Sequence, residues 1–353
     1  MLCPYCLNDV IFDKGKVNKY TCPHCKQEVP TVYVQETDTK RVTVSAVGFS
    51  GHGKSVCFAS LFYFLDRLVE FWPKFCYMAL DDISIRTVYD NKKLLSQGIL
   101  PPPTPNNFPI PSIINFMKIP LFGDRIFLFY DISGESAESI TNLTTYASFI
   151  KNSRMMTFFI SLSDLNVDGE IKRDDCSLGG EMSRLLQVYI NAYLRIGGER
   201  KSQDLLVVFT KGDRLRDMLP KDVWEYLRCG VSEIYGKECK TSDDDMLRHT
   251  DRLKDISDTL RKFVENNLKA KIFTNLAKEY FKSVNFIVIS SLGAEPTDGR
   301  WSAIPKRVED ILIWLAYSQE ESNKLTSMSA KSCWERKSEF PPDKRFSIGK
   351  FWI

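Results

Sequence analysis

The sequence predicts an α/β fold in which a mostly parallel sheet, with one antiparallel hairpin strand, has helices on both faces. Three short runs rich in Val, Ile, Leu or Phe, at 41–47, 205–209 and 285–289, have the length and branched side chains of buried strands. Between and after them apolar residues recur at helical spacing, as at 185–192 and 308–315. Strands that alternate with helices are typical of a parallel sheet covered on both sides.

Composition is that of an ordinary soluble protein, because 43% of the 353 residues are apolar and 26% are charged. No apolar run approaches the ~18 residues that span a bilayer, and the first residues lack the blocks of a signal peptide. We therefore expect a cytoplasmic protein without membrane contact. The net charge of +3 is too small to give the whole chain an electrostatic footprint for nucleic acid.

Two cysteine pairs near the N-terminus have the spacing of metal knuckles. They are Cys3-Pro-Tyr-Cys6 and Cys22-Pro-His-Cys25, and 15 residues separate them. This pattern predicts a zinc ribbon over residues 1–36 in which the four cysteines hold one Zn²⁺, while His24 is a bystander. The other cysteines are scattered, as expected in a reducing compartment; they are Cys57, Cys76, Cys176, Cys229, Cys239 and Cys333.

The sequence indicates the metal of the ribbon more directly than its function. Residues 1–30 hold four lysines against three acids, and four thiolates around Zn²⁺ add negative charge, so the ribbon is not basic. Phosphate contacts need clustered Lys or Arg. We expect docking of a protein or a structural role, with nucleic-acid binding through the ribbon as the alternative.

A glycine-rich loop follows the first strand and opens a helix. It reads Gly48-Phe-Ser-Gly51-His-Gly53-Lys54-Ser55, a P-loop. Its backbone N–H groups enclose phosphate oxygens, Lys54 reaches the β and γ phosphates, and the Ser55 hydroxyl binds Mg²⁺. We expect the His52 side chain to face solvent, although it is placed to touch phosphate. The predicted phosphate-binding residues are Gly48, Ser50, Gly51, His52, Gly53, Lys54, Ser55 and Val56.

A predicted hairpin, 111–119 followed by 126–130, ends in Asp131-Ile-Ser-Gly134-Glu135. In this D-x-x-G motif Asp131 is expected to bind Mg²⁺ through water, and the Gly134 N–H to face the γ phosphate.

A second magnesium hydroxyl is expected between the P-loop helix and this hairpin. Thr104, in a proline-rich loop, is the candidate; the alternatives are Thr87, which falls in a helical stretch, and a stiff loop with an incidental threonine.

Two further strand ends are predicted to bind the base. The strand 205–209 ends in Thr210-Lys211-Gly212-Asp213, where the Asp213 carboxylate can accept both N1–H and N2–H of guanine while the Lys211 stem lies along the base. The last strand leads into Ser290, Ser291 and Leu292, which are expected to present a backbone N–H to the guanine O6. Adenine cannot offer the same donors, so the carboxylate predicts guanine specificity.

With these segments in this order, the chain resembles the Ras-like P-loop GTPases of the translation-factor class over residues 40–318. The Pro-Pro-Thr switch, Asp-x-Ser-Gly-Glu, Thr-Lys-x-Asp and the closing Pro305-Lys-Arg-Val-Glu-Asp are, more narrowly, similar to the double-GTPase families of bacterial conflict systems. The resemblance implies a P-loop GTPase fold with GTP or GDP and Mg²⁺, and protein partners in a multi-component system.

The resulting domain organisation has three parts. A zinc ribbon occupies residues 1–36, a Ras-like GTPase domain occupies 37–318, and a polar tail with scattered aromatic residues occupies 319–353. The GTPase domain carries expected helical insertions at about 66–103 and 214–282, which either bind partners or pad the structure.

The expected catalytic residues are Lys54, Thr104 and Glu135. Ras-like enzymes commonly orient the attacking water with Gln directly after D-x-x-G, and a glutamate there is repelled by the γ phosphate. The leading hypothesis is a GTP-operated, hydrolytic switch in a bacterial conflict or defence assembly. The alternatives are a non-hydrolysing GTP-bound protein that docks through the ribbon and tail, and a nucleic-acid-dependent NTPase.

Overall fold

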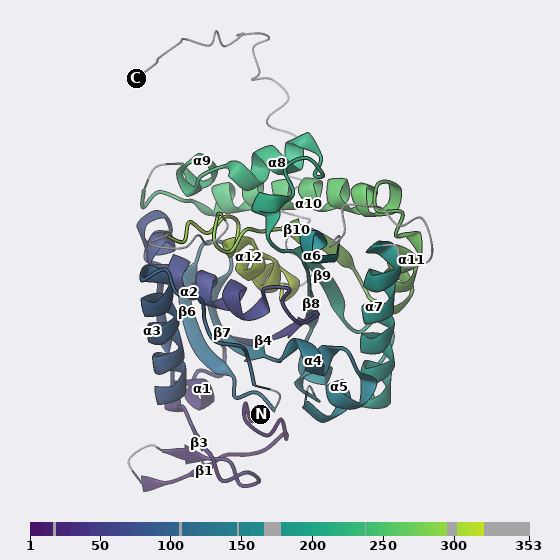
Figure 1. Ribbon diagram of the computed structural model, residues 1–353. Helices are drawn as coiled ribbons and strands as arrows, with labels where there is room; N and C mark the ends of the chain where they lie inside the picture. The colour runs from purple at the N-terminus through teal and green to yellow at the C-terminus, as the bar shows by residue number, and fades with distance from the viewer. Residues whose placement is uncertain are drawn as a thin grey trace. The chain divides into compact units, whose positions relative to one another are not determined.

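A seven-stranded sheet forms the centre of the computed structural model, with its strands in the order β10-β9-β8-β4-β7-β6-β5 (Figure 1). The structure describes residues 1–16, 19–105, 108–146, 148–165, 178–236, 238–294 and 302–320. The sheet strands are β4 (Lys40–Val47), β5 (Cys76–Ala79), β6 (Ser112–Ile119), β7 (Gly123–Asp131), β8 (Met155–Ile160), β9 (Asp204–Phe209) and β10 (Val284–Val288).

The strand directions confirm the predicted fold class. From β10 to β7 every neighbouring pair is parallel, whereas β6 is antiparallel to both β7 and β5. Every residue of β8 and β9 is buried, as expected for parallel strands covered on both faces. The hairpin between β6 and β7 turns at Gly123, whose φ of 70° suits glycine.

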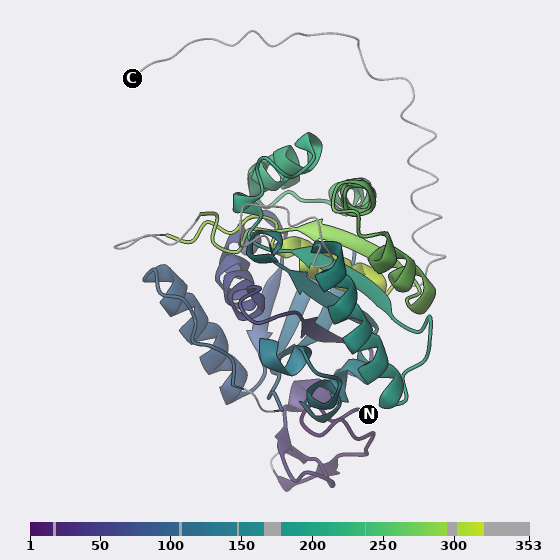
Figure 2. The same ribbon diagram turned by 45° about the vertical axis from the view of Figure 1, so that its right-hand side comes forward.

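Helices cover the sheet in two groups that lie on opposite sides of it in Figures 1 and 2. In one group α2 packs against α3, and in the other α7 packs against α5 and α11. The helices are α1 (Thr31–Gln35), α2 (Lys54–Phe71), α3 (Asp82–Ser96), α4 (Gly134–Ala137), α5 (Ile140–Tyr146), α6 (Leu162–Leu165), α7 (Leu178–Arg195), α8 (Lys221–Arg228), α9 (Val231–Tyr235), α10 (Asp243–Asn266), α11 (Lys271–Tyr280) and α12 (Glu309–Ser318).

Helix α2 fixes the P-loop to the core. Its apolar side chains include the fully buried Leu61 and Leu65. Phe58 and Phe62 each meet the ring of Phe129 in β7 edge-to-face, at 5.4 Å between ring centroids. Aromatic pairs in this geometry add stability beyond the area they bury. The start of α2 is therefore held rigidly beside the end of β7.

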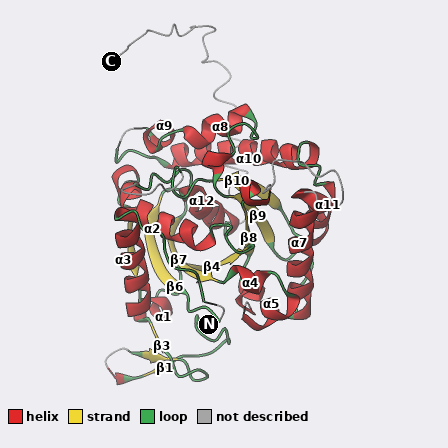
Figure 3. Ribbon diagram, in the orientation of Figure 1, coloured by secondary structure: helices red, strands yellow, loops and turns green. Residues whose placement is uncertain are grey.

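The N-terminal ribbon is a small antiparallel sheet of β1 (Asp13–Lys14), β2 (Tyr20–Thr21) and β3 (Glu28–Val29), drawn as short strands in Figure 3. Side-chain hydrogen bonds fasten it to the main sheet. The Tyr130 hydroxyl donates to the Pro4 carbonyl at 2.6 Å, and the Tyr5 hydroxyl donates to Asp81 at 2.8 Å. The first cysteine knuckle thus touches β7 and the start of α3.

The two insertions differ in content. Residues 214–282 contain the predicted helices, here α8 to α11, whereas 66–103 contributes the edge strand β5 as well as α3. The first insertion therefore holds a strand that the sequence did not indicate, Cys76–Ala79 paired with β6, beside the expected helix. The tail beyond residue 320, like Cys176, lies outside the described residues. In the part of the chain that is described, no helix has the length and apolar character to cross a membrane.

Candidate functional site

The four ribbon cysteines form one compact sulfur cluster. Their sulfur atoms all lie within 4.8 Å of one another, with 3.8 Å between Cys3 and Cys25 and 3.7 Å between Cys6 and Cys22. A tetrahedral Zn²⁺ with Zn–S bonds of ~2.3 Å requires sulfur separations of about 3.8 Å, whereas a disulfide requires about 2 Å. The cysteines therefore fit a structural zinc site. His24 instead contacts Asn8 through Nδ1.

The P-loop adopts the backbone shape that a phosphate cradle needs. Gly51 and Gly53 have φ angles of 76° and 77°, a region that favours glycine. A Cβ added at Gly48 would lie 2.4 Å from the Phe159 carbonyl oxygen, so only glycine allows β4 to leave the sheet this close to β8. The loop then opens directly into α2, whose N-terminal N–H groups favour an anion.

Lys54 lies inside this loop rather than in solvent. Its ammonium donates to the carbonyl oxygens of Gly48 and Phe49 at 2.8 and 2.9 Å. Burial of the side chain lowers the pKa of Lys54 to about 8. Phosphate oxygens are stronger acceptors than these carbonyls, so the ammonium is positioned to exchange them for a charged partner.

Three oxygen-bearing side chains from different segments converge beside the P-loop. The hydroxyls of Ser55 and Thr104 lie 2.6 Å apart, and Thr104 donates to the Asp131 carboxylate at 2.8 Å. Burial raises the pKa of Asp131, and its Oδ1 has no hydrogen-bond partner among the described residues. Two hydroxyls and a carboxylate are ligands that suit Mg²⁺. Thr87 instead bonds within α3, to the Ile83 carbonyl.

A cavity of about 570 Å³ opens beside these groups. The proline-rich loop from Pro101 to Thr104 forms one wall, and Gly134 and Glu135 form another. Gly134 approaches the P-loop so closely that an added Cβ would lie 2.1 Å from the Ser50 Cα. Any side chain at this position would displace the P-loop, which explains the glycine. Glu135 is exposed at the cavity wall.

A second cavity of about 240 Å³ holds the predicted base-reading residues. Asp213 lines it together with Ser291 and Leu292, and the Ser290 hydroxyl donates to the Asp213 carboxylate. Gly51, Gly53 and Val56 line both this cavity and the larger one, so the two are neighbours across the P-loop. Most of the predicted phosphate-binding and base-reading residues therefore border two adjoining cavities.

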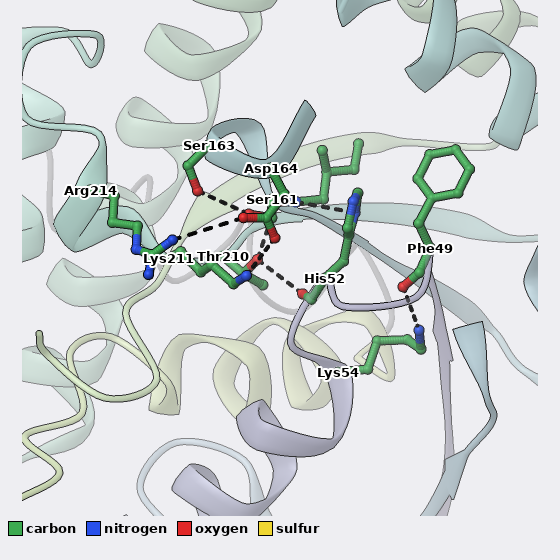
Figure 4. A network of polar contacts seen from close by, with 10 residues as sticks. Phe49, His52, Lys54, Ser161, Ser163, Asp164, Thr210, Lys211 and Arg214 are labelled. Carbon is green, nitrogen blue, oxygen red and sulfur yellow. Dashed lines mark hydrogen bonds and ion pairs between the residues drawn. The ribbon is translucent and has the colours of Figure 1, made fainter. Parts of the chain in front are cut away.

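Thr210 ties this second cavity to the P-loop, and Lys211 ties it to helix α6 (Figure 4). The Thr210 hydroxyl donates to the His52 carbonyl at 3.0 Å. The Lys211 ammonium forms an ion pair with Asp164, in the short helix α6 after β8. Nothing in the sequence marked Asp164 beyond its place after an apolar strand, because the pairing depends on the relative position of β8 and β9. The ion pair fixes the end of the Lys211 side chain.

The His52 side chain does not face solvent, which corrects the sequence-based expectation. It is 4% exposed, packs edge-to-face on Phe49, and accepts a hydrogen bond from the Ser161 N–H through Nδ1 at 3.2 Å (Figure 4). Burial lowers its pKa to about 4, so the imidazole is neutral at pH 7. His52 therefore joins the P-loop to the end of β8 through its ring.

No protein-family model matches the chain, and no curated protein matches it. Among solved structures, the GTP-bound Ski7 GTPase-like domain of S. cerevisiae is similar over 80% of this chain and 51% of that chain, with a TM-score of 0.32 and 13% identity. Sup35 complexed with GMPPNP is similar over 80% of this chain and 45% of its own, with a TM-score of 0.26 and 13% identity. The chain spans about half the length of these structures.

Proposed function

We propose that this chain binds GTP and GDP with Mg²⁺ and hydrolyses GTP as a molecular switch. The observation that carries the proposal is that two adjoining cavities share P-loop residues, with Lys54 and the Asp131 cluster beside one and Asp213 in the other. If the triphosphate of a nucleotide lies in the first cavity, its base can lie in the second. Ser55, Thr104 and Asp131 would hold the magnesium ion, which supplies charge neutralisation to the phosphates.

Guanine selection follows from the chemistry of Asp213. A carboxylate only accepts hydrogen bonds, and guanine offers two adjacent donors whereas adenine offers an acceptor at N1. The Ser290 hydroxyl occupies one carboxylate oxygen and fixes the orientation of the group. The remaining acceptor capacity of Asp213, which lines the cavity, would be available to the base.

Hydrolysis is assigned to Lys54, Thr104 and Glu135. Lys54 would provide positive charge to the β and γ phosphates, Thr104 would contribute its hydroxyl to the metal, and Glu135, at the wall of the same cavity, would orient the attacking water. The exposed carboxylate of Glu135 also supports a second candidate function. Since an ionised glutamate is repelled by the γ phosphate, bound GTP would then persist and serve a structural role in a protein that docks through its ribbon and tail.

We extend the proposal to a role in a bacterial conflict or defence assembly with protein partners, on the basis of the motif resemblance alone. The Cys3, Cys6, Cys22 and Cys25 site would supply a rigid docking module, because Zn²⁺ provides the folding free energy that so short a segment lacks. Nucleic acid remains the alternative ligand of the ribbon, in which case DNA or RNA would stimulate nucleotide turnover.

Single-turnover hydrolysis separates the two main candidates. GTP is loaded onto the wild type and onto Glu135→Gln, and phosphate release is followed with and without DNA or RNA. A hydrolytic switch releases phosphate, and more rapidly with glutamine, which removes the repelled charge. If both proteins bind GTP and neither releases phosphate, the non-hydrolysing function is supported instead.

A further inference from the structure

A groove of about 920 Å³ lies between the zinc ribbon and the main sheet, away from the nucleotide cavities. On the ribbon side it is lined by β3 and the residues around it, and on the other side by β5 and the start of α3. In Figure 1 the label β3 lies below the lower end of α3. No residue that lines this groove also lines the phosphate or base cavity.

Two sheet edges border this groove. In the described chain β3 is an outer strand of the ribbon sheet and β5 an outer strand of the main sheet. An outer strand leaves one row of backbone N–H and C=O groups outside the ladder, which makes it a template for another strand. Glu28 and Val29 of β3 and Met78 and Ala79 of β5 line the groove, so residues of both outer strands border the same space.

The groove also exposes aliphatic side chains. Met78 is 44% exposed, Ile83 is 46% exposed and Ile110 is 59% exposed. Along β5 the residues alternate, with Cys76 and Met78 exposed and Tyr77 and Ala79 turned inward. Three exposed aliphatic residues around one concave space mark an interaction surface more than single scattered ones do.

The charge of the groove selects the chemistry of its occupant. Its lining holds three carboxylates, Glu28, Asp81 and Asp82, against one ammonium, Lys19. Lys19 pairs with Glu28 at 2.9 Å, and Asp81 accepts from Tyr5 and from the Ser84 N–H at the start of α3. Asp82 is exposed. The surplus is negative, so a cationic occupant gains electrostatic energy here and an anionic one loses it.

We propose that this groove binds an extended, basic segment of a partner protein by strand addition to β5. Alternate apolar side chains of the segment cover Met78, Ile83 and Ile110, and its Lys or Arg side chains face Asp82. Strand addition of this kind takes affinity from main-chain hydrogen bonds and specificity from side-chain pockets. The proposal is independent of nucleotide binding.

Selection of peptides tests the proposal before any partner has been identified. A phage-displayed library of random peptides of about ten residues, the upper range of strand length, is panned on the full chain. We expect enriched sequences in which apolar residues alternate with Lys or Arg. No enrichment, or enrichment of acidic sequences, would overturn the proposal. If the groove instead binds a second copy of this chain, no peptide is enriched and ultracentrifugation shows a dimer that Ile83→Asp dissociates. This result would also overturn the proposal.

A matched pair of variants locates the binding site. An enriched peptide, labelled with a fluorophore, should bind Ile83→Ser at least about tenfold more weakly, because the variant removes an apolar contact without adding charge. Ile85→Ser is the control, because Ile85 is 52% exposed on the same helix but does not line the groove. Asp82→Lys should likewise weaken binding. Equal affinity for wild type and Ile83→Ser would contradict the assignment.

N-methylation of the peptide tests strand addition without altering the protein. Methyl groups on every second backbone nitrogen remove the donors of one peptide edge, and shifting them by one residue removes those of the other edge. One of the two methylated peptides should lose binding, since only one edge pairs with β5. If both methylated peptides bind like the parent peptide, strand addition is wrong. Because the protein is unaltered, misfolding of a variant cannot explain this result.

Discussion

The Thr104 hydroxyl lies 2.8 Å from the Asp131 carboxylate and 2.6 Å from the Ser55 hydroxyl, although the three residues come from separate segments. The buried Oδ1 of Asp131 has no partner in the described chain. A buried carboxylate without a full set of partners destabilises the folded state unless a cation or another hydrogen-bond donor binds to it. This cluster is therefore the expected place for magnesium.

Thr104→Ala should lower the affinity of the nucleotide complex for Mg²⁺, because it would remove one proposed oxygen ligand and leave Asp131 with fewer partners. We expect about tenfold more Mg²⁺ to be needed for half-maximal GTP retention, in line with the loss of one bond to a charged group. The measurement is nucleotide dissociation across a magnesium titration. Thr87→Ala is the control, since the Thr87 hydroxyl donates to the Ile83 carbonyl within its own helix. Equal shifts in the two variants would contradict the role of Thr104.

Lys54→Ala should abolish nucleotide retention. The lysine is buried in the P-loop and would supply the positive side chain to the phosphates, so its removal should cost about 3 kcal/mol or more, roughly a hundredfold in affinity. Equilibrium binding of a fluorescent guanine nucleotide measures the change, with the exposed Lys262→Ala as control. Unchanged affinity in Lys54→Ala would mean that the loop binds no phosphate.

One Zn²⁺ per chain should copurify with the protein, held by the four clustered cysteines. Cys22→Ser should lower the zinc content and loosen the ribbon, whereas Cys76→Ser should not, because Cys76 is exposed and outside the cluster. Elemental analysis of protein purified without chelator measures this directly. An absence of zinc in the wild type would refute the site.

His52 predicts a pH dependence of stability. Burial lowers the pKa of His52 to about 4, below the usual 6.5. Between pH 6.5 and pH 4, His52 is therefore protonated in the unfolded chain but not in the folded one. Stability should therefore fall as pH drops from 6.5 toward 4, by up to about 3 kcal/mol from this residue. Urea unfolding across this range should show a flatter profile for His52→Asn, which keeps an acceptor for Ser161. The exposed His24→Gln should retain the wild-type slope.

Three candidate site residues were each predicted from a short motif at the end of a strand. Lys54 follows β4, Asp131 ends β7 and Asp213 follows β9, as the spacing within each motif predicts. The Lys211–Asp164 ion pair and the contact of Tyr130 with Pro4 join segments far apart in sequence, and no local pattern encodes such pairs.

Other features were missed because their local pattern is ambiguous. Strand β5 has only four residues, Cys-Tyr-Met-Ala, which do not distinguish a strand from a helix end. His52 is polar and stands between two glycines, which favoured exposure, but the end of β8 offers its ring a backbone donor in the interior. Only the packing of β8 against the P-loop decides its burial.

Asp213→Asn should shift base preference from guanine toward xanthine. The new amide donates to the C2 carbonyl of xanthine, whereas the wild-type carboxylate can only accept. XTP should therefore displace a fluorescent nucleotide from the variant better than GTP does. A variant that still prefers GTP as strongly as the wild type would show that Asp213 does not read the base.

Competition between GTP and ATP for a fluorescent guanine nucleotide on the wild-type protein tests guanine-nucleotide binding most directly. Adenine loses two charge-assisted hydrogen bonds to Asp213 and leaves the carboxylate desolvated, at ~1.5 to 3 kcal/mol for each bond. GTP should thus displace the probe at concentrations at least about a hundredfold lower than ATP. Equal displacement by ATP and GTP would contradict the assignment of Thr210-Lys211-Gly212-Asp213 as a guanine site, and with it the proposal that this protein is a GTPase.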